Sequence, residues 1–151
     1  MRAVIQNVKD CTLRINGDIF SHIDSGFLIL IGFTQGDNIE LGKKLIDKII
    51  NLRVFPDENG KTNLSLKDIN GEIMCVSQFT LYADVEKGRR PSFIKALAFE
   101  DASKLYDEFC EELRSQFGKI ELGSFGADMK ISFTNDGPFT LMLDTKDIWG
   151  L

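Results

Sequence analysis

The feature that most constrains the fold is an unbroken apolar run from Phe27 to Ile31, with the sequence FLILI. A strand that carries apolar side chains on both faces must be covered on both faces, so it belongs in the middle of a sheet. The run is far too short to span a bilayer. It therefore predicts a central strand, around which the rest of the chain is arranged.

The segment before this run has the signals of further strands. Val4, Gln6 and Val8 alternate along the chain, and Asn16-Gly17 is the strongest short signal for a hairpin. Asp24-Ser25-Gly26 is typical of a turn that leads into the apolar run. Residues 2–34 are therefore predicted to form four strands.

Two segments have the apolar spacing of helices. The first begins after Asp37 or Asn38, either of which is a good N-cap, and ends near Asn51. The second ends at Gly118, which suits a helix C-terminus. Their apolar positions are, for the first helix, Leu41, Leu45, Ile49 and Leu52, and, for the second, Ala102, Leu105, Tyr106, Phe109, Leu113 and Phe117.

The remaining apolar segments are short and predict strands over residues 73–76, 120–122, 129–133 and 139–143. About nine strands in hairpins with two long helices indicate an α+β fold with mostly antiparallel sheet. A chain of 151 residues is most simply one domain, residues 1–151, and it buries about 68 to 70% of its unfolded surface. We therefore expect a single domain with a core of its own.

The cysteines and the N-terminus predict the compartment. Cys11, Cys75 and Cys110 are odd in number and widely spaced, which fits neither a disulfide framework nor a metal knuckle. The first residues contain no apolar segment of the kind found in signal peptides. We expect a cytoplasmic protein with buried thiols, no membrane segment, no metal and no cofactor.

The net charge of −5 argues at first against an RNA partner, because phosphate binding needs a positive surface. Six acidic residues against one lysine over residues 100–112 account for the whole excess. The rest of the chain is balanced and includes a basic cluster of Lys87, Arg89, Arg90 and Lys95. This cluster could meet RNA while the acidic helix faces away, or it could be a solvated turn.

The stretch from Cys75 to Phe93 is the best candidate for a functional site. Its buried strand ends in three polar residues, Ser77, Gln78 and Thr80, which are followed by the basic cluster. Backbone N–H groups that leave the strand pairing at such a place can be directed at a ligand. The same pattern also fits an ordinary strand end followed by a charged turn.

Side chains for familiar catalytic arrangements are scarce. His22 is the one histidine and lies in a predicted strand, where packing is the commoner role. Cys75 has apolar neighbours, which raise a thiol pKa and do not activate it. Gly60-Lys61-Thr62 suggests a phosphate loop, but the required first glycine is replaced by Phe55, so we discard that interpretation.

Seven sequence words identify the chain as similar to a known family, the D-aminoacyl-tRNA deacylases, which hydrolyse the ester between a D-amino acid and tRNA. The strongest words are SQFTLYAD (77–84) and NDGPFT (135–140). The others are MRAVIQ (1–6) with NLRVF (51–55), GKTNLS (60–65), GRRPSF (88–93) and FGADM (125–129). The resemblance covers nearly the whole chain and implies the β/β/α layers of such deacylases.

The resemblance implies that the substrate supplies part of the chemistry. The 2′-hydroxyl of the terminal adenosine assists the attack of water, while backbone donors near Ser77, Gln78, Phe79 and Thr80 stabilise the oxyanion, each at about 10² to 10³ in rate. Thr80 has no neighbouring base, so we expect it to position the substrate and not to act as the nucleophile.

The resemblance also gives Gly137-Pro138 a role. By base rate the bond would be trans, because only about 5 to 6% of such bonds in folded proteins are cis. The resemblance implies a cis peptide that enters the pocket of a partner subunit and rejects L-amino acids, hence a homodimer. Glycine, which has no side chain to reject, would also be accepted, so hydrolysis of glycyl-tRNA is expected.

Two other functions fit parts of the sequence. A noncatalytic RNA-binding or dimeric scaffold module would keep the fold without the reaction. A related group of deacylases clears other misacylated tRNAs, but it alters the SQFT word, which stands intact here from Ser77 to Thr80.

Overall fold

The computed structural model describes all 151 residues. It contains seven strands, three α-helices and one 3-10 helix, η1. In chain order these are β1 (Arg2–Ile15), β2 (Asp18–Gly32), α1 (Ile39–Ile50), β3 (Phe55–Pro56), β4 (Thr62–Leu64), β5 (Glu72–Ser77), η1 (Phe79–Tyr82), α2 (Phe99–Phe117), β6 (Ile120–Leu122), β7 (Lys130–Asp144) and α3 (Thr145–Trp149).

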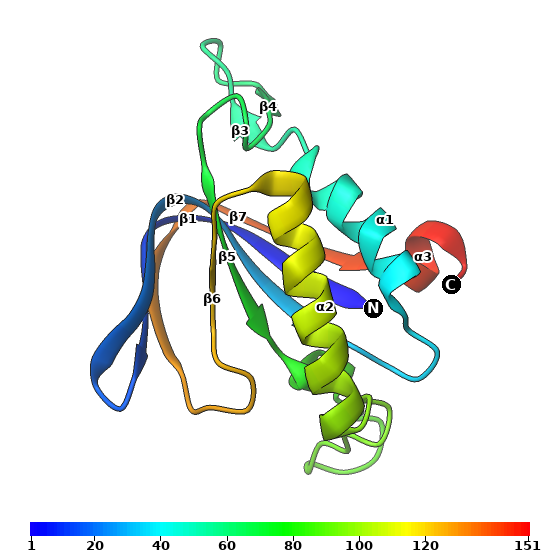
Figure 1. The fold of residues 1–151 in the computed structure, drawn as a ribbon. Helices are drawn as coiled ribbons and strands as arrows, with labels where there is room; N and C mark the ends of the chain where they lie inside the picture. The colour runs from blue at the N-terminus through cyan, green and yellow to red at the C-terminus, as the bar shows by residue number, and fades with distance from the viewer.

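Five strands form one sheet in the order β6-β5-β2-β1-β7. β1 pairs antiparallel with β2 and β7, whereas β5 joins β2, and β6 joins β5, in parallel. β3 and β4 form a separate small hairpin that projects at the top of Figure 1. The predicted α+β class and the central position of residues 27–31 are confirmed, and antiparallel pairing predominates within a mixed sheet.

The three longest strands are bent, so their outer halves curl back over the sheet (Figure 1). At the bend Asp10 of β1 has a φ of 51° and Gly26 of β2 has a φ of 143°. A Cβ on Gly26 would lie 1.9 Å from the carbonyl oxygen of Glu72, so only glycine fits there. The bend creates the expected layers: the two halves of one bent sheet and the helices outside it.

The prediction of four strands over residues 2–34 was wrong. Asp24-Ser25-Gly26 does not reverse the chain but continues β2, because Ser25 and Gly26 still pair with Lys9 and Val8 of β1. The separate strands expected over 129–133 and 139–143 are likewise one strand, β7, whose pairing with β1 contains two shifts of register. The expected total of nine strands was too high for the same reason.

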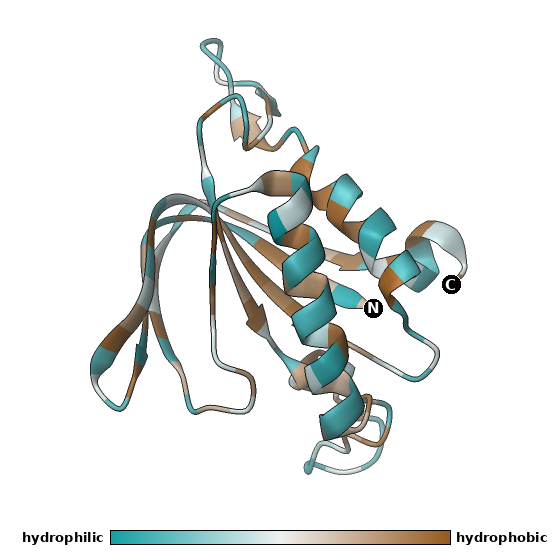
Figure 2. Cartoon of the chain, viewed as in Figure 1, coloured by the Kyte–Doolittle hydropathy of each residue, from teal (hydrophilic) through white to brown (hydrophobic).

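The larger core lies between the sheet and the helices α1 and α2. Figure 2 shows both helices with their apolar sides toward the sheet and their polar sides outward. Phe27, Ile29 and Ile31 of β2 are fully or almost fully buried in this core. A smaller core fills the inside of the bend and consists of Val8, Cys11, Leu13, Ile23, Leu28, Met74 and Val76.

The helix ends follow the sequence signals closely. The side chain of Asn38 accepts a hydrogen bond from the N–H of Leu41 at 3.0 Å, so Asn38 is the N-cap of α1. Gly118 has a φ of 105° directly after the last residue of α2. The short helix α3 was not predicted. No helix has both the length and the apolar character needed to cross a membrane.

Candidate active site

The polar segment after β5 lies at the carboxyl end of the central parallel strands. The N–H of Gln78 still donates to the carbonyl of Ile31, at 2.7 Å, and the chain then turns into η1. The first N–H groups of a helical turn have no partner inside that turn, which leaves those of Phe79 and Thr80 outside its hydrogen bonding. The polar segment thus joins the end of a strand to the start of a helical turn, where the backbone donors are not used by the turn itself.

A cavity of about 620 Å³ opens beside this segment. Its volume is typical of small-molecule sites, which span roughly 300 to 1,000 Å³. Most of its lining is apolar and comes from four separate parts of the chain, within residues 31–33, 76–79, 93–102 and 125–131. The sheet, the start of α2 and a loop after β6 thus meet at the polar end of β5.

Aromatic rings frame this cavity. Phe79 and Phe93 pack edge to face with their centroids 4.9 Å apart, and Phe99 and Phe125 do the same at 5.1 Å. Phe79 and Phe99 are more than half exposed, at 55% and 66%. Exposed rings beside an apolar cavity offer faces against which a planar group can stack.

The hydroxyl of Thr80 has one side-chain partner. The Gln78 amide nitrogen donates a hydrogen bond to Thr80 Oγ1. An amide N–H cannot accept the hydroxyl proton, so this contact orients the hydroxyl without activating it. Thr80 is not among the residues that line the cavity, and its positioning role stays a prediction.

The basic loop, residues 85–91, follows η1 and is closed at its base by Asp84. Asp84 and Ser92 exchange two backbone hydrogen bonds of 2.7 and 2.9 Å. The ammonium of Lys95 lies 2.9 Å from the Asp84 carboxylate, and this contact and the N–H of Glu86 lower the pKa of Asp84. Lys95, which the sequence placed with the RNA-facing cations, is thus occupied with holding the loop.

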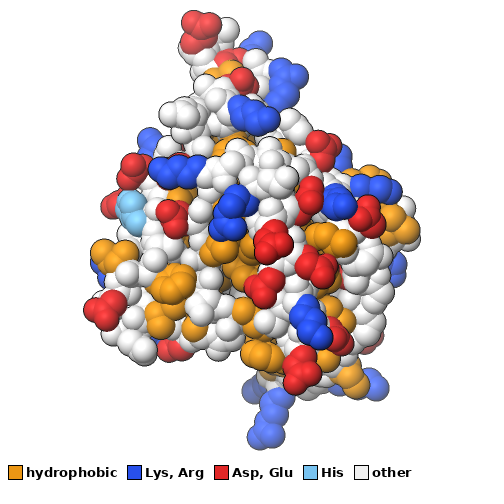
Figure 3. Space-filling view, in the orientation of Figure 1, with side chains coloured by type: hydrophobic (Ala, Val, Ile, Leu, Met, Phe, Trp, Pro, Cys, Tyr) orange, Lys and Arg blue, Asp and Glu red, His pale blue; other side chains and the backbone are white.

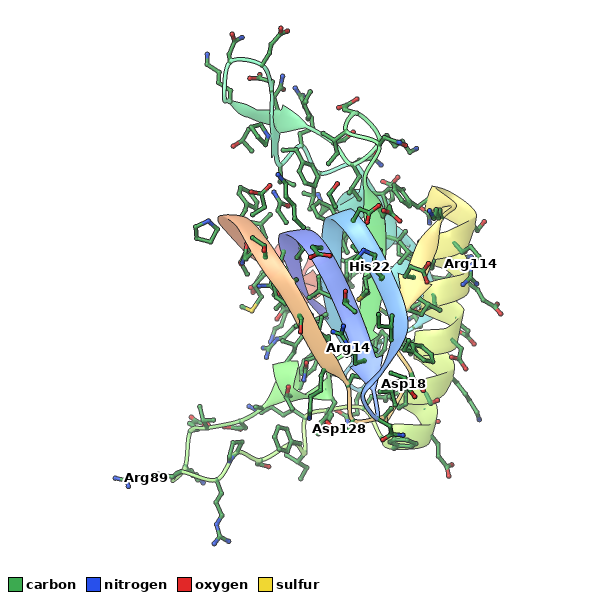
Figure 4. All side chains as sticks on the ribbon, turned by 90° about the vertical axis from the view of Figure 1, so that its left-hand side faces the viewer. Arg14, Asp18, His22, Arg89, Arg114 and Asp128 are labelled. Atoms are coloured by element: carbon green, nitrogen blue, oxygen red, sulfur yellow. The ribbon has the colours of Figure 1, made fainter.

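The three other cations of the cluster, Lys87, Arg89 and Arg90, are exposed and have no carboxylate partner. Arg89 points away from the body of the molecule in Figure 4. In Figure 3, basic side chains gather at the bottom while acidic side chains line the outer face of α2. The separation of charge that the sequence indicated is present in the structure.

Gly137 and Pro138 lie at an exposed corner in the middle of β7, and the peptide bond between them is cis. The side chain of Asn135 fixes the corner: its oxygen accepts from the N–H of Phe139 at 2.9 Å and its nitrogen donates to Thr140 Oγ1 at 2.8 Å. Gly137 has a φ of 149°. The general preference of X-Pro bonds for the trans isomer therefore predicted the wrong isomer for Gly137-Pro138.

One chain does not bring Gly137-Pro138 to the cavity. β5 and β7 are separated in the sheet by β2 and β1, which at about 4.8 Å per strand is about 14 Å. Through the strand pairing, Ser77 is in register with Ala3 of β1, whereas the corner lies opposite the segment from Gln6 to Val8. The two sites are therefore also displaced from each other along the strands. Neither Gly137 nor Pro138 lines the cavity.

His22 and Cys75 lie outside the site, as their sequence contexts indicated. His22 Nδ1 is 2.8 Å from Thr12 Oγ1, and its Nε2 is 3.0 Å from Asp24 Oδ1, on the curled part of β2 (Figure 4). Cys75 is fully buried; a hydrogen bond with Cys110 and burial raise its pKa well above the ordinary value. Neither side chain lines the aromatic cavity.

Comparison with known proteins identifies the family. Residues 4–144 match the family model described as D-Tyr-tRNA(Tyr) deacylase. The chain belongs to this family. D-aminoacyl-tRNA deacylase of Clostridium beijerinckii is 54% identical over 146 residues, covering 97% of this chain and 98% of that protein. D-aminoacyl-tRNA deacylase of Thermosipho africanus is 52% identical and covers 99% of this chain and all of that protein.

Two solved structures have a fold similar to that of this chain. The structure named c-Myc DNA Unwinding Element Binding Protein has a TM-score of 0.90 and 40% identity, covering 95% of this chain and 98% of that chain. A probable eukaryotic D-amino acid tRNA deacylase has a TM-score of 0.84 at 21% identity, covering 94% of this chain and 97% of that chain, and shows the shared fold.

Sequence reasoning missed most of the cavity. Phe93 and Phe125 lie inside the family words GRRPSF and FGADM, and Phe99 begins α2, yet none of the three stood out as a site residue. Phe99 is an apolar residue outside the buried stripe of its helix, which was an available signal. The pairing of Phe99 with Phe125 joins segments far apart in the chain and has no counterpart in local spacing.

Proposed function

We propose that this protein hydrolyses the ester bond of D-aminoacyl-tRNA and releases the D-amino acid and the free tRNA. The observation that carries the proposal is the aromatic cavity at the SQFT segment in a chain that belongs to the deacylase family. An apolar cavity with backbone donors at one edge suits the aminoacylated terminal nucleoside of a tRNA, because the base can stack while the ester faces the donors.

Catalysis in this proposal relies on backbone donors and on the substrate. The N–H groups of Phe79 and Thr80 stabilise the negative charge that develops on the ester carbonyl oxygen. The 2′-hydroxyl of the terminal ribose assists the attacking water. Ser77, Gln78 and Thr80 hold this segment and the substrate in place, and no side chain is required as a nucleophile.

Thr80→Ala separates these roles. The variant removes only the hydroxyl that Gln78 contacts, so we expect a modest loss of rate, whereas a 2′-deoxy terminal adenosine should slow hydrolysis more. Single-turnover rates on both substrates measure the difference. Complete inactivity of a folded, tRNA-binding Thr80→Ala enzyme, together with full activity of the wild type on the 2′-deoxy substrate, would reverse the assignment.

Chirality is screened, in the same proposal, by the Gly137-Pro138 corner of a partner subunit. The corner is exposed and distant from the cavity of its own chain, which supports a homodimer with sites that two subunits share. An L side chain would meet the inserted backbone, while a D side chain would point away. Glycine has no side chain to reject, so some hydrolysis of glycyl-tRNA accompanies the main activity.

The tRNA approaches over the basic loop. Lys87, Arg89 and Arg90 are close in sequence to η1 and are not occupied by carboxylates, so they are available for backbone phosphates. The acidic face of α2 repels the nucleic acid and favours one direction of approach. The reaction takes place in the cytoplasm, where aminoacyl-tRNA is made and used.

The test is to follow loss of the ester from D-tyrosyl-tRNA and L-tyrosyl-tRNA with purified protein. We expect rapid loss for the D substrate and little loss for the L substrate above the spontaneous rate. Equal rates on the two substrates would contradict chiral screening. Tight tRNA binding with no hydrolysis of either would favour the noncatalytic RNA-binding module.

A further inference from the structure

Arg2, the first residue of β1, contacts the turn η1 through two different groups. Its Nη1 donates a hydrogen bond to the carbonyl oxygen of Leu81 at 2.9 Å. Its guanidinium carbon lies 4.6 Å from the centre of the Tyr82 ring, and Tyr82 is only 7% exposed. Leu81 and Tyr82 are the last two residues of η1, so Arg2 fixes the end of the turn whose beginning presents the Phe79 and Thr80 N–H groups.

The same guanidinium is held from the other side by Asp144. Arg2 Nε donates to Asp144 Oδ2 at 2.8 Å, while Asp144 Oδ1 accepts from the N–H of Lys146 and caps α3. Burial by itself would raise the pKa of Asp144, but the hydrogen bonds from Arg2 and Lys146 outweigh it and keep this pKa below its ordinary value. Asp144 is therefore ionised and, besides pairing with Arg2, serves as the N-cap of α3.

These contacts lie apart from the substrate cavity. Arg2, Tyr82 and Asp144 line a second cavity of about 680 Å³, which shares no lining residue with the aromatic cavity. On the sheet side, η1 rests on Gly32, where an added Cβ would lie 2.7 Å from the carbonyl oxygen of Gln78. The turn thus packs against Gly32 on the sheet side and is held at its carboxyl end by the contacts of Arg2 with Leu81 and Tyr82.

We propose that Arg2 is a positioning residue for ester hydrolysis, which holds η1 so that the backbone donors at its start keep their direction toward the substrate carbonyl. This inference rests on the proposed function. The chain leads directly from η1 into the basic loop. Without the contacts of Arg2, the end of η1 would be free to move with that loop. Because the catalytic donors are backbone groups, their direction depends entirely on the path of the chain.

The proposal predicts a loss of rate without an equal loss of binding. Arg2→Ala should lower the single-turnover rate on D-tyrosyl-tRNA by about tenfold, since small displacements of catalytic groups are costly, and should change KM by less than about twofold. Arg2→Lys should recover part of the rate. An ammonium can still reach either the Leu81 carbonyl oxygen or the Asp144 carboxylate, but it lacks the planar contact with Tyr82.

Asp144→Asn is the matched control for a purely structural role. Asparagine can still accept the hydrogen bond from Lys146, but it lacks the charge that pairs with Arg2. Arg2→Ala and Asp144→Asn should lower the Tm to a similar extent, whereas Asp144→Asn should keep the rate within about twofold of wild type, since the Arg2 contact with Leu81 remains. Equal loss of rate in the two variants, or an unchanged rate in Arg2→Ala, would overturn the inference.

Hydrogen exchange separates this inference from the proposed function. The N–H groups of Leu81 and Ala83 bond within the segment, to Gln78 and Thr80, at 3.3 and 3.0 Å. In Arg2→Ala their amide protons should exchange faster, while those of α1 should not change. If wild type fails to hydrolyse D-tyrosyl-tRNA, the proposed function falls, and exchange still decides whether Arg2 holds the turn; unchanged exchange overturns the inference.

Discussion

Phe79 allows the proposed backbone contact with the oxyanion to be tested directly. It is the first residue of η1, and proline is tolerated at the first position of a helix because the N–H there has no partner inside the helix. Phe79→Pro removes both the N–H and the ring, whereas Phe79→Ala removes only the ring. We expect Phe79→Pro to be slower than Phe79→Ala by about 10² in single-turnover rate.

Circular dichroism and tRNA binding serve as the controls for this pair, because both variants must remain folded and bind tRNA for the comparison to hold. Equal rates in the two variants would show that the Phe79 N–H has no part in stabilising the oxyanion.

Gly137 is the second residue at which the mechanism can be tested. A Cβ on Gly137 would lie 2.7 Å from the backbone nitrogen of Phe139, and the φ of 149° is unfavourable for an L-residue. Gly137→Ala should therefore displace the corner and lower the rate on D-tyrosyl-tRNA without creating activity on L-tyrosyl-tRNA. Gly60→Ala is the matched control, since Gly60 also has a positive φ but lies in the hairpin far from the cavity, with open space around it.

An unchanged D-specific rate in Gly137→Ala would remove the corner from the mechanism. A gain of L-tyrosyl-tRNA hydrolysis would show instead that the corner screens chirality in a way that an added methyl group relaxes.

The basic loop is an element whose contribution depends on salt. Arg89 and Arg90 are exposed and have no carboxylate partner, so replacing both with alanine should weaken tRNA binding and raise KM, with little change in the single-turnover rate at saturation. The slope of log affinity against log salt should become shallower by about 0.7 to 0.9 for each phosphate that the variant no longer neutralises. Titrations of tRNA binding at several salt concentrations measure this slope.

Lys61→Ala is the control for the loop, because Lys61 is an exposed cation in the turn between β3 and β4, at the opposite end of the molecule (Figure 1). An equal change of slope in Lys61→Ala would show that the loop acts only through net charge.

Elements with a local chemical cause were predictable from the sequence. Asn38 and Gly118 gave the right ends of the helices because capping depends on the residue at one position and its neighbours. Gly26 was misinterpreted as part of a turn because its positive φ is needed equally in a turn and in a bent strand. Only the close approach of Glu72, from a strand much later in the chain, decides between the two.

The residues of the site also fall into those that local sequence could reveal and those that only the fold brings together. Ser77, Gln78 and Thr80 were recognisable because polar residues at the end of a buried strand need partners. The aromatic cavity was not, because it forms where the end of β5, the start of α2 and the segment after β6 meet. The contacts of Arg2 with Leu81 and Asp144 are separated by 79 and 142 positions in the sequence, so local spacing cannot reveal them.

The distance between the cavity and the Gly137-Pro138 corner makes the assembly of the molecule testable. If each site takes Phe79 from one subunit and Gly137 from the other, a mixed dimer of Phe79→Pro and Gly137→Ala chains contains one site with both changes and one site with neither. Random pairing makes about half of all dimers mixed, so the mixture should recover about a quarter of wild-type activity, well above either parent.

Mixed dimers can also be isolated by giving the two variant chains different affinity tags and purifying on both in turn. Each isolated dimer should then have about half of the wild-type activity, because one of its two sites is intact. If the corner and the cavity of one chain formed a complete site, every site in a mixed dimer would carry one change, and the isolated dimer would be no more active than its parents. Sedimentation of the wild-type protein as a monomer would contradict the shared site before any mixing.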